Sequence, residues 1–471
     1  MMRTSDWTPD LNGVSGPTYL AIANALADSI EKGTLRAGDR LPPQRTLAAL
    51  LGIDFTTVSR GYAEAQRREL IEARVGQGTY VRSPKLKLVS SDATSSIHML
   101  INHPPRFINP ALEARIWEGI PGALADRGMD MLMRYQVPSG AMKDRVVGAN
   151  WLGGRLPGLT VERVLICPGA QGALLATAMM LARTGETICI EELTYPGFIL
   201  LAKELGIRLA PVEMDEHGAR PDSLDLICRS EKPKAFYCTP ILHNPTTVSM
   251  PLARRIALVE VARRHNLPII EDDNYWPLFA TRGKTSEALK EFPSLASLAP
   301  ELVYYIAGIA KCVSPALRIA YLVVPDQHAA DRADTMIRAT ASMAAPLSAA
   351  LASYWIESGL ADAILDAIRA ESNARQTIAH QILSSDLSGS NTEGFHLWLP
   401  LPPPWTLNAF TTQLRIAGIS IAGSEAFSVS PAPEGVRLCL GAPDTRADLD
   451  RCLQRIADIL HLKSPAHRQV I

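Results

Sequence analysis

Short apolar segments alternate with helical patterns along most of the chain, and this alternation limits the possible folds more than any other feature. The helical stretches include residues 171–183 and 251–265. Strands that alternate with helices are typical of a mostly parallel sheet covered by helices on both faces. The sequence therefore predicts an α/β domain from about residue 97 onward. The expected strands are Val164–Cys167, Thr187–Glu191, Ala235–Cys238, Pro268–Glu271, Val303–Ala307 and Ile319–Val324.

The chain is too long for a single hydrophobic core. Its 471 residues exceed what one core usually organises, so at least two domains are expected. Residues 83–96 are rich in serine and show little periodicity, which is typical of a linker. We therefore predict one domain at residues 14–82 and a second at residues 97–471.

Composition and charge exclude several classes of protein. The hydrophobic fraction is 47% and the charged fraction is 20%, which indicates a globular chain. The longest apolar run, residues 173–182, is far shorter than the roughly 20 residues that span a bilayer. Seven cysteines without a CxxC pair suggest neither a disulfide framework nor a zinc site, so a reducing cytoplasm is the expected compartment. A net charge of −1 does not indicate a nucleic-acid partner, so evidence for one has to come from the local pattern of residues.

Three helices and a hairpin are predicted in the first domain. A first helix carries apolar residues at every fourth position. Leu47, Leu50 and Leu51 are expected to form the buried face of a second helix, and Asp54 is placed to cap a third. Two short β-patterns within residues 71–81 flank a glycine-rich turn, which predicts a hairpin. This order of elements is typical of a winged helix-turn-helix.

The third predicted helix has the composition of a DNA-reading helix. Such a helix needs small polar residues and a base-edge reader near its N-terminus. The same pattern also fits a small helical protein-interaction domain with a solvated polar face. The candidate DNA-binding residues are Arg45, Thr56, Thr57, Ser59 and Arg60, with Gly76 and Gly78 at a wing tip that could approach DNA closely.

A resemblance to the winged-helix domain of GntR-type bacterial regulators covers almost the whole run GDRLPPQRTLAALLGIDFTTVSRGYAEAQRRELIEARVGQGTYV. Gly38, Pro42, Tyr62 and Val81 are among the matching landmarks. Some members of the family have an arginine where this chain has Phe55, so one contact to phosphate or base is expected to be missing.

Several polar residues of the second domain could serve one chemical site. A lysine such as Lys311, in a partly desolvated pocket, can form a Schiff base with an aldehyde. Arg318 could bind a phosphate bidentately, and Asp272 could hold a pyridine nitrogen protonated. Each residue also has an ordinary explanation, because Lys311 could be a surface lysine and Asp272 a helix cap. Further candidates are Tyr275 and Asn244, which could donate to a phenolate oxygen, and Gly169, Ala170 and Gln171, whose backbone N–H groups could meet a phosphate at the start of a helix.

The order and spacing of these residues resemble pyridoxal-phosphate (PLP) enzymes of the aspartate-aminotransferase type, fold type I, from about residue 135 to residue 460. The resemblance implies that Tyr195 stacks on the cofactor ring, that Lys311 carries PLP and that Arg437 binds a substrate α-carboxylate. The motifs that carry it are CPGAQGALL, EELTYPG, TPILHNPTTVSM, IIEDDNYW, GIAKCVSPALRIAYL and VRLCLG.

Three positions depart from the usual pattern of that family. Gly308 and Ala310 stand where hydroxyl-bearing residues are common, and Thr247 replaces the glycine of NPTG. The loss of a hydroxyl that binds a phosphate removes a charged hydrogen bond, typically worth ~1.5–3 kcal/mol. PLP is still expected to bind, because the covalent link and Arg318 remain, but less tightly.

A GntR-type winged helix joined to an aminotransferase-like domain is the architecture of MocR regulators, which this sequence resembles over nearly its full length. The resemblance implies PLP as a sensor cofactor, an amino-compound effector and a homodimer. We therefore predict a cytoplasmic transcriptional regulator that binds operator DNA and senses an amino compound through aldimine chemistry at Lys311. Two alternatives are an active aminotransferase with an accessory DNA-binding domain, and a regulator for which PLP itself is the exchangeable effector.

Overall fold

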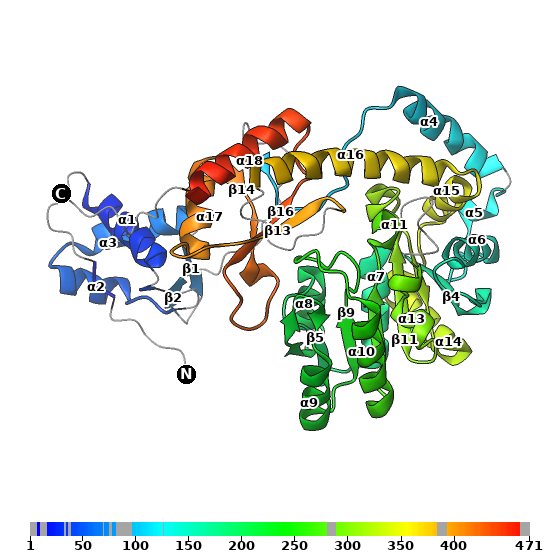
Figure 1. Cartoon of the computed structure of the whole chain (residues 1–471). Helices are drawn as coiled ribbons and strands as arrows, with labels where there is room; N and C mark the ends of the chain where they lie inside the picture. The colour runs from blue at the N-terminus through cyan, green and yellow to red at the C-terminus, as the bar shows by residue number, and fades with distance from the viewer. Residues whose placement is uncertain are drawn as a thin grey trace. The chain divides into compact units, whose positions relative to one another are not determined.

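The structure is a computed structural model that divides into two compact units, residues 1–94 and 95–471 (Figure 1). The predicted linker at residues 83–96 and the predicted wing-tip residue Gly76 lie outside the described residues. The structure describes residues 7–9, 17–32, 34–35, 39–68, 70–74, 78–81, 97–125, 127–279, 289–383 and 393–461.

A winged helix-turn-helix forms the first unit, as the sequence predicts. Helices α1 (Thr18–Glu31), α2 (Gln44–Leu51) and α3 (Phe55–Arg67) precede an antiparallel hairpin of β1 (Ile71–Arg74) and β2 (Gly78–Val81). Apolar side chains from all five elements fill one core, which therefore holds the helices and the wing together. The core includes Ile22, Leu26, Leu47, Val58, Tyr62, Ile71 and Val81.

The turn between α2 and α3 follows its expected chemistry, with one correction. Asp54 accepts a hydrogen bond from the backbone N–H of Thr56 at 2.7 Å, so the predicted cap of α3 is confirmed. The expectation that Leu50 is buried is wrong, because 61% of its surface is exposed. The eight-residue helix α2 has one narrow buried face, and Leu47 and Ala48 occupy it instead.

A seven-stranded sheet forms the centre of the second unit, with strand order β4-β12-β11-β10-β9-β5-β6. Strand β12 runs antiparallel to both of its neighbours, and the other pairings are parallel. The six predicted strands are confirmed to within about one residue, and the edge strand β6 was missed because its sequence, RLAPV, contains a proline. The strands are β4 (Val164–Cys167), β5 (Thr187–Glu191), β6 (Arg208–Val212), β9 (Ala235–Cys238), β10 (Ile269–Asp272), β11 (Val303–Gly308) and β12 (Ala320–Val323).

Helices cover both faces of this sheet, so the α/β prediction is confirmed. Successive residues of one strand point to opposite faces, as Leu165 and Ile166 of β4 do, and each face packs into its own apolar core. One face is covered by α7 (Gly169–Leu181), α8 (Pro196–Glu204) and α14 (Gln327–Ala341). The other is covered mainly by α9 (Pro221–Glu231), α10 (Leu252–His265) and α15 (Pro346–Glu357).

A smaller subdomain follows the long helix α16 (Leu360–Leu383), which runs across the second unit in Figure 1. Its three-stranded sheet has the order β13-β16-β15 and packs under α16, α17 and α18. The first strand of the unit, β3, pairs in parallel with β14, so the chain enters the unit through this subdomain. The bounds are β3 (Ile97–His98), β13 (His396–Pro400), α17 (Leu407–Ile416), β14 (Ile419–Ser420), β15 (Ala422–Gly423), β16 (Gly435–Cys439) and α18 (Arg446–His461).

The remaining elements are short or lie at the periphery of the second unit. No helix of the described segments is long and apolar enough to cross a membrane. These elements are α4 (Pro110–Ala125), α5 (Asp130–Met133), α6 (Met142–Leu152), β7 (Met214–Asp215), β8 (Gly218–Ala219), α11 (Trp276–Phe279), α13 (Leu295–Leu298) and the 3-10 turns η1 (Val161–Arg163), η2 (Ile309–Lys311), η3 (Pro315–Leu317) and η4 (Ser424–Ala426).

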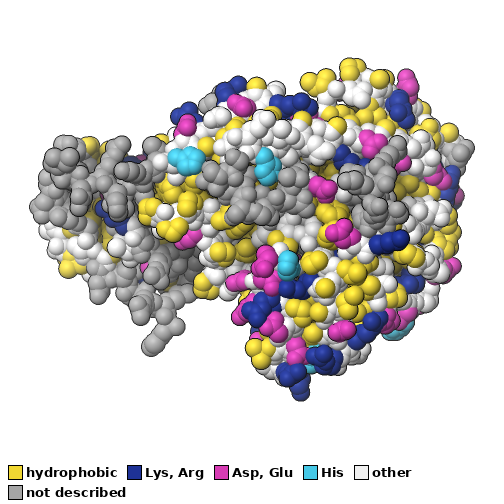
Figure 2. Space-filling view, in the orientation of Figure 1, with side chains coloured by type: hydrophobic (Ala, Val, Ile, Leu, Met, Phe, Trp, Pro, Cys, Tyr) yellow, Lys and Arg dark blue, Asp and Glu magenta, His cyan; other side chains and the backbone are white. Residues whose placement is uncertain are grey.

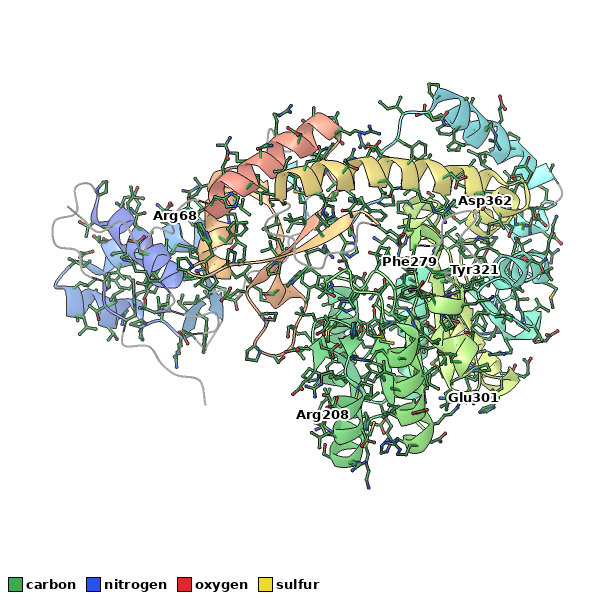
Figure 3. All side chains as sticks on the ribbon, viewed as in Figure 1. Arg68, Arg208, Phe279, Glu301, Tyr321 and Asp362 are labelled. Carbon is green, nitrogen blue, oxygen red and sulfur yellow. The ribbon has the colours of Figure 1, made fainter. Side chains whose placement is uncertain are left out.

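Close packing of α6 on the sheet predicts a stability effect at Gly148. A Cβ added at Gly148 would overlap the ring of Tyr321, which Figure 3 labels on β12. Overpacking of this kind typically costs about 1–3 kcal/mol, so Gly148→Ala is expected to lower the midpoint of thermal unfolding. Gly154→Ala is the matched control, because an added Cβ there meets nothing within 4 Å. Equal midpoints for the two variants would contradict the packing of α6 against Tyr321.

Candidate functional site

The candidate site lies at the edge of the large sheet where its parallel strands end. The carboxyl ends of parallel strands meet at one edge, where α/β proteins usually bind ligands. The antiparallel strand β12 begins at this same edge, so residues just before it belong to the site as well. The predicted residues follow these strand ends in order: Gly169, Ala170 and Gln171 after β4, Tyr195 after β5, Asn244 after β9, Asp272 at the end of β10, Tyr275 just after it, Lys311 after β11 and Arg318 before β12.

An anion cradle is formed by the start of α7 and Arg318. Gly169 opens the helix with φ +75°, and an added Cβ would lie 2.9 Å from Nη2 of Arg318. The first backbone N–H groups of the helix have no partner within it and attract anions. Gln171 donates from Nε2 to the carbonyl oxygen of Gly197 at 2.9 Å, while its buried Oε1 has no partner among the described residues. This arrangement fits a phosphate group.

A residue with a hydroxyl-bearing side chain does not fit at position 308, because Asn274 fills the space beside Gly308. A Cβ at Gly308 would overlap Oδ1 of Asn274, which already accepts a hydrogen bond from the Gly308 N–H at 2.6 Å. The Nδ2 of Asn274 donates to Oδ1 of Asp272. Sequence reasoning missed Asn274, and its only signal was its place between Asp272 and Tyr275. It ties the end of β10 to the end of β11.

Asp272 is buried and held from two sides. Its Oδ2 accepts a hydrogen bond from the hydroxyl of Tyr237 at 2.9 Å, in addition to the bond from Asn274 at Oδ1. Burial raises the pKa of Asp272 to about 7. A carboxyl group in this state gains most from a cationic partner, such as a protonated ring nitrogen. The sequence did not identify Tyr237, which lies on β9 and stacks on Phe198 at 4.0 Å.

Lys311 and Arg437 lie at the same site, although they come from different subdomains. The Nζ of Lys311 donates to the carbonyl oxygen of Asn102 at 2.5 Å. Burial, followed by the nearby charge of Arg437, lowers the pKa of Lys311 to about 8. A substantial fraction of Lys311 is therefore a neutral, nucleophilic amine slightly above neutral pH.

Arg437 is buried and uses its guanidinium as a bridge. Its Nη1 donates to Oδ1 of Asn244 at 2.7 Å, and its Nη2 donates to the carbonyl oxygen of Leu100 at 2.5 Å. The guanidinium carbon lies 4.9 Å from the ring centroid of Phe427. The buried Nε finds no partner within the described segments. Arg437 is therefore placed to bind a carboxylate, and Asn244 keeps its Nδ2 as a donor.

Tyr275 and Tyr195 are the remaining predicted residues of the site. The buried hydroxyl of Tyr275 accepts a hydrogen bond from Nδ2 of Asn102 at 2.8 Å, so it still has a proton to donate. Burial raises the pKa of Tyr195, Asp272 raises it further, and Arg318 and Arg437 oppose the shift. The Tyr195 hydroxyl is therefore within electrostatic range of three other predicted site residues.

Thr247 keeps the turn that a glycine usually forms at its position. Its φ is +63°, in the left-handed region, and its N–H donates to the carbonyl oxygen of His243 at 2.6 Å. Such a conformation costs of order 1–3 kcal/mol in a residue other than glycine. The change from NPTG to NPTT therefore alters the side chain but not the turn that positions Asn244.

The predicted DNA-binding residues lie on and around the start of α3. Thr56 and Arg60 are exposed, while Thr57 and Ser59 are half-buried. The hydroxyl of Thr56 donates to the capping Asp54 at 2.5 Å, so it has a structural partner as well.

Arg45 and Gly78 have local partners of their own. The guanidinium carbon of the exposed Arg45 lies 5.9 Å from the ring centroid of Phe55. Phe55, which stands where some family members have an arginine, therefore stabilises Arg45 through a cation–π contact. Gly78 has φ +114°, and an added Cβ would lie 3.0 Å from Nε of Arg40. The glycine is therefore needed for the close approach of Arg40 to the wing.

Comparisons with known proteins agree with this geometry. Residues 130–456 match the family described as Aminotransferase class I and II. The chain belongs to the aminotransferase class I and II family. Residues 18–81 match the family described as Bacterial regulatory proteins, gntR family. This member of the aminotransferase family therefore has the two-part composition of a MocR-type regulator, as its sequence predicts.

Two proteins named as regulators match along nearly the whole chain, and a solved aminotransferase structure matches most of it. The chain is 27% identical to the HTH-type transcriptional regulator YdeF of Bacillus subtilis over 467 residues, which cover 96% of each chain. It is 26% identical to the HTH-type transcriptional regulator TauR of Rhodobacter capsulatus over 461 residues, or 90% of this chain and 92% of TauR. The solved structure of the α-aminoadipate aminotransferase LysN of Thermus thermophilus matches with a TM-score of 0.68 at 22% identity, covering 78% of this chain and 92% of LysN. The fold-type I architecture is therefore confirmed.

The raised pKa of Asp272 predicts a pH-dependent stability difference in the cofactor-free protein. Its carboxyl group titrates near pH 7 in the fold, against an ordinary value of 3.8. Between these values the unfolded chain binds fewer protons than the folded one, so rising pH destabilises the fold. Relative to Asp272→Asn, the wild type should lose up to about 2 kcal/mol of unfolding free energy between pH 5 and pH 7, at ~1.36 kcal/mol per pKa unit.

Urea unfolding of both proteins at the two pH values measures this difference. Asp331→Asn, which removes an exposed carboxylate, is the control and should change little between the two pH values. A difference between wild type and Asp272→Asn that does not depend on pH would show that burial does not control this carboxyl group.

Proposed function

We propose that this protein is a PLP-dependent, DNA-binding transcriptional regulator that senses an amino compound at Lys311. The observation that carries the proposal is the meeting of Lys311, Asp272 and Arg437 at one sheet edge, in a chain that also contains a winged helix. Its relatives YdeF and TauR are named as transcriptional regulators, and LysN was solved with N-(5'-phosphopyridoxyl)-L-leucine.

The residues at the site fit PLP. Arg318 and the start of α7 would hold the phosphate, Asp272 would pair with the ring nitrogen, and Tyr195 would lie against the ring. Tyr275 and Asn244 would donate to the ring oxygen. When bound, PLP supplies an aldehyde carbon that reacts with amines and a ring that withdraws electrons. The low pKa of Lys311 favours attachment, because the neutral amine is the reactive form.

An effector with both an amine and a carboxylate suits the remaining groups. Its amine would compete with Lys311, and its carboxylate would take the guanidinium of Arg437. Asn244 already contacts Arg437, so the effector carboxylate would meet an arginine whose orientation is fixed. Binding can change DNA affinity only if the effector prefers one arrangement of the winged helices.

A homodimer is part of the proposal. Large apolar side chains are exposed along α4 to α6, and the exposed fractions of Ile108 and Tyr135 are 96% and 88%. Figure 2 shows hydrophobic side chains on the outer surface over α4. Contiguous exposed apolar residues usually mark a protein interface. We place the protein in the cytoplasm, where DNA is available and where its seven buried free thiols would stay reduced.

Two variants separate attachment of PLP from binding of the effector. Lys311→Ala should give no borohydride-fixed PLP adduct by mass spectrometry, whereas Lys203→Ala should keep it, because Lys203 is exposed and remote from the motif. Arg437→Ala should keep the adduct but require about 10–100-fold more amino acid for the same spectral change, as expected for the loss of a charged hydrogen bond of ~1.5–3 kcal/mol.

The outcome also discriminates between the alternatives. An adduct that survives in Lys311→Ala would overturn the attachment site. Stoichiometric release of a keto acid, without any effect of amino acids on DNA affinity, would favour the aminotransferase with an accessory domain. DNA affinity that responds to PLP but to no amine would favour PLP as the effector, an alternative that Gly308 and Ala310 support because both lack a hydroxyl.

The DNA-binding face makes a separate prediction. Arg45→Ala and Arg60→Ala should each weaken binding to DNA selected from a random pool by ~1–3 kcal/mol if the side chain reads a base edge. Arg67→Ala is the control, because Arg67 lies at the far end of α3 and pairs with Glu64 at 2.8 Å. Fluorescence anisotropy at fixed salt measures the affinities. Equal affinity of all three variants and the wild type would show that α3 does not read DNA.

A further inference from the structure

The main chain of the segment Met99–His103, here called the arm, contacts the side chains of Lys311 and Arg437. The carbonyl oxygen of Leu100 accepts from Nη2 of Arg437, and that of Asn102 accepts from Nζ of Lys311, both at 2.5 Å. Leu100 and Asn102 are two residues apart. One short stretch of backbone therefore occupies both of the groups that an amino acid and its cofactor would use.

The arm is held at its first residue and confined further along. Met99 is fully buried in the core of the smaller subdomain, and its N–H donates to the carbonyl oxygen of Ser420 at 2.7 Å. A Cβ added at Gly441 would overlap the carbonyl oxygen of His103. The arm therefore passes between the smaller subdomain and the sheet edge and is packed closely against both.

The side chain of Asn102 fixes the arm to the floor of the site. Its Nδ2 donates to the hydroxyl of Tyr275 at 2.8 Å, while only 5% of the residue is exposed. Its buried Oδ1 has no partner in the described part of the chain. A buried acceptor without a partner is unfavourable, so this amide is poised to receive a donor from a ligand.

Binding at the site removes the partners of the arm. If the neutral amine of Lys311 condensed with the aldehyde of PLP, its nitrogen would bond to the aldehyde carbon and its two N–H hydrogens would leave with the aldehyde oxygen as water. Lys311 would then lose the N–H groups from which it donates to Asn102 here. A carboxylate on Arg437 makes charge-assisted hydrogen bonds roughly twice as strong as neutral ones, and it competes with the Leu100 carbonyl. A carbonyl that loses its donor inside the protein is unfavourable, which favours a shift of the arm.

We propose that the arm is the sensor of occupancy, and that Asn102 is the positioning residue that holds it against Tyr275 and Lys311. This inference rests on the proposed function. The arm follows β3 near the start of the second unit, on the side of the chain that leads to the winged helix. Effector-dependent DNA affinity is expected to require this shift of the arm.

Hydrogen–deuterium exchange of the full chain, with and without PLP, tests the first step. PLP should speed exchange of the Met99 and His103 amides roughly threefold to tenfold, as expected when hydrogen bonds of about 1 kcal/mol are lost. Amides of β9 and β10 should not change in this direction. Unchanged exchange in the arm, while mass spectrometry shows PLP on Lys311, would overturn the inference and leave the proposed function intact. If no PLP attaches to Lys311, the proposed function fails and the inference falls with it.

A pair of variants tests the role of Asn102. In the absence of PLP, Asn102→Ala should show the faster arm exchange and the DNA affinity of the PLP-loaded wild type, and it should still take up PLP. Ile101→Ala is the matched control, because Ile101 lies in the same arm with its side chain exposed. Asn102→Ala and Ile101→Ala with the same exchange and the same DNA affinity would show that the amide does not hold the arm.

Discussion

Three consecutive buried carboxyl groups at the end of β10 organise the second unit. Glu271 accepts hydrogen bonds from the N–H groups of Leu295 and Ala296 at 2.9 and 2.8 Å, and Asp273 pairs with Arg155 at 2.8 Å and with the hydroxyl of Tyr305 at 3.0 Å. An unpaired buried charge would cost several kcal/mol, so these partners hold α13, α6's C-terminal turn and β11 in place around the strand. The alternation of the strand turns Asp272 to the opposite face, toward the ligand site. Two of these acidic residues, Glu271 and Asp273, therefore hold the surrounding elements, while Asp272 between them belongs to the candidate site.

The sequence predicts those parts of the site that depend on short-range pattern. Strand ends are set by local periodicity, so the positions of Asp272 and Lys311 relative to the sheet follow from the sequence once the strands are assigned. Asn102 and Tyr237 could not be found in this way, because each reaches the site from a distant segment and neither belongs to a motif. The burial of Leu50 was misjudged for a related reason: the pattern defines an apolar face of α2 but not how much of it the neighbouring helices cover.

Two of the three departures from the aminotransferase pattern have different structural settings. At Gly308 the amide of Asn274 fills the space where a side chain would stand, and it bonds both to the Gly308 main chain and to Asp272. At Thr247 the side chain is fully buried and φ is +63°, a conformation that glycine adopts more readily.

The turn between β11 and β12 joins Lys311 to Arg318 through seven residue steps. These two cationic residues therefore belong to one loop, whose two ends are fixed by neighbouring antiparallel strands. An insertion or deletion in this loop would displace one contact relative to the other, and no adjustment of a single side chain could restore both. The length of the loop thus sets the distance between these two cationic groups, and this distance limits the size of a molecule that can contact both.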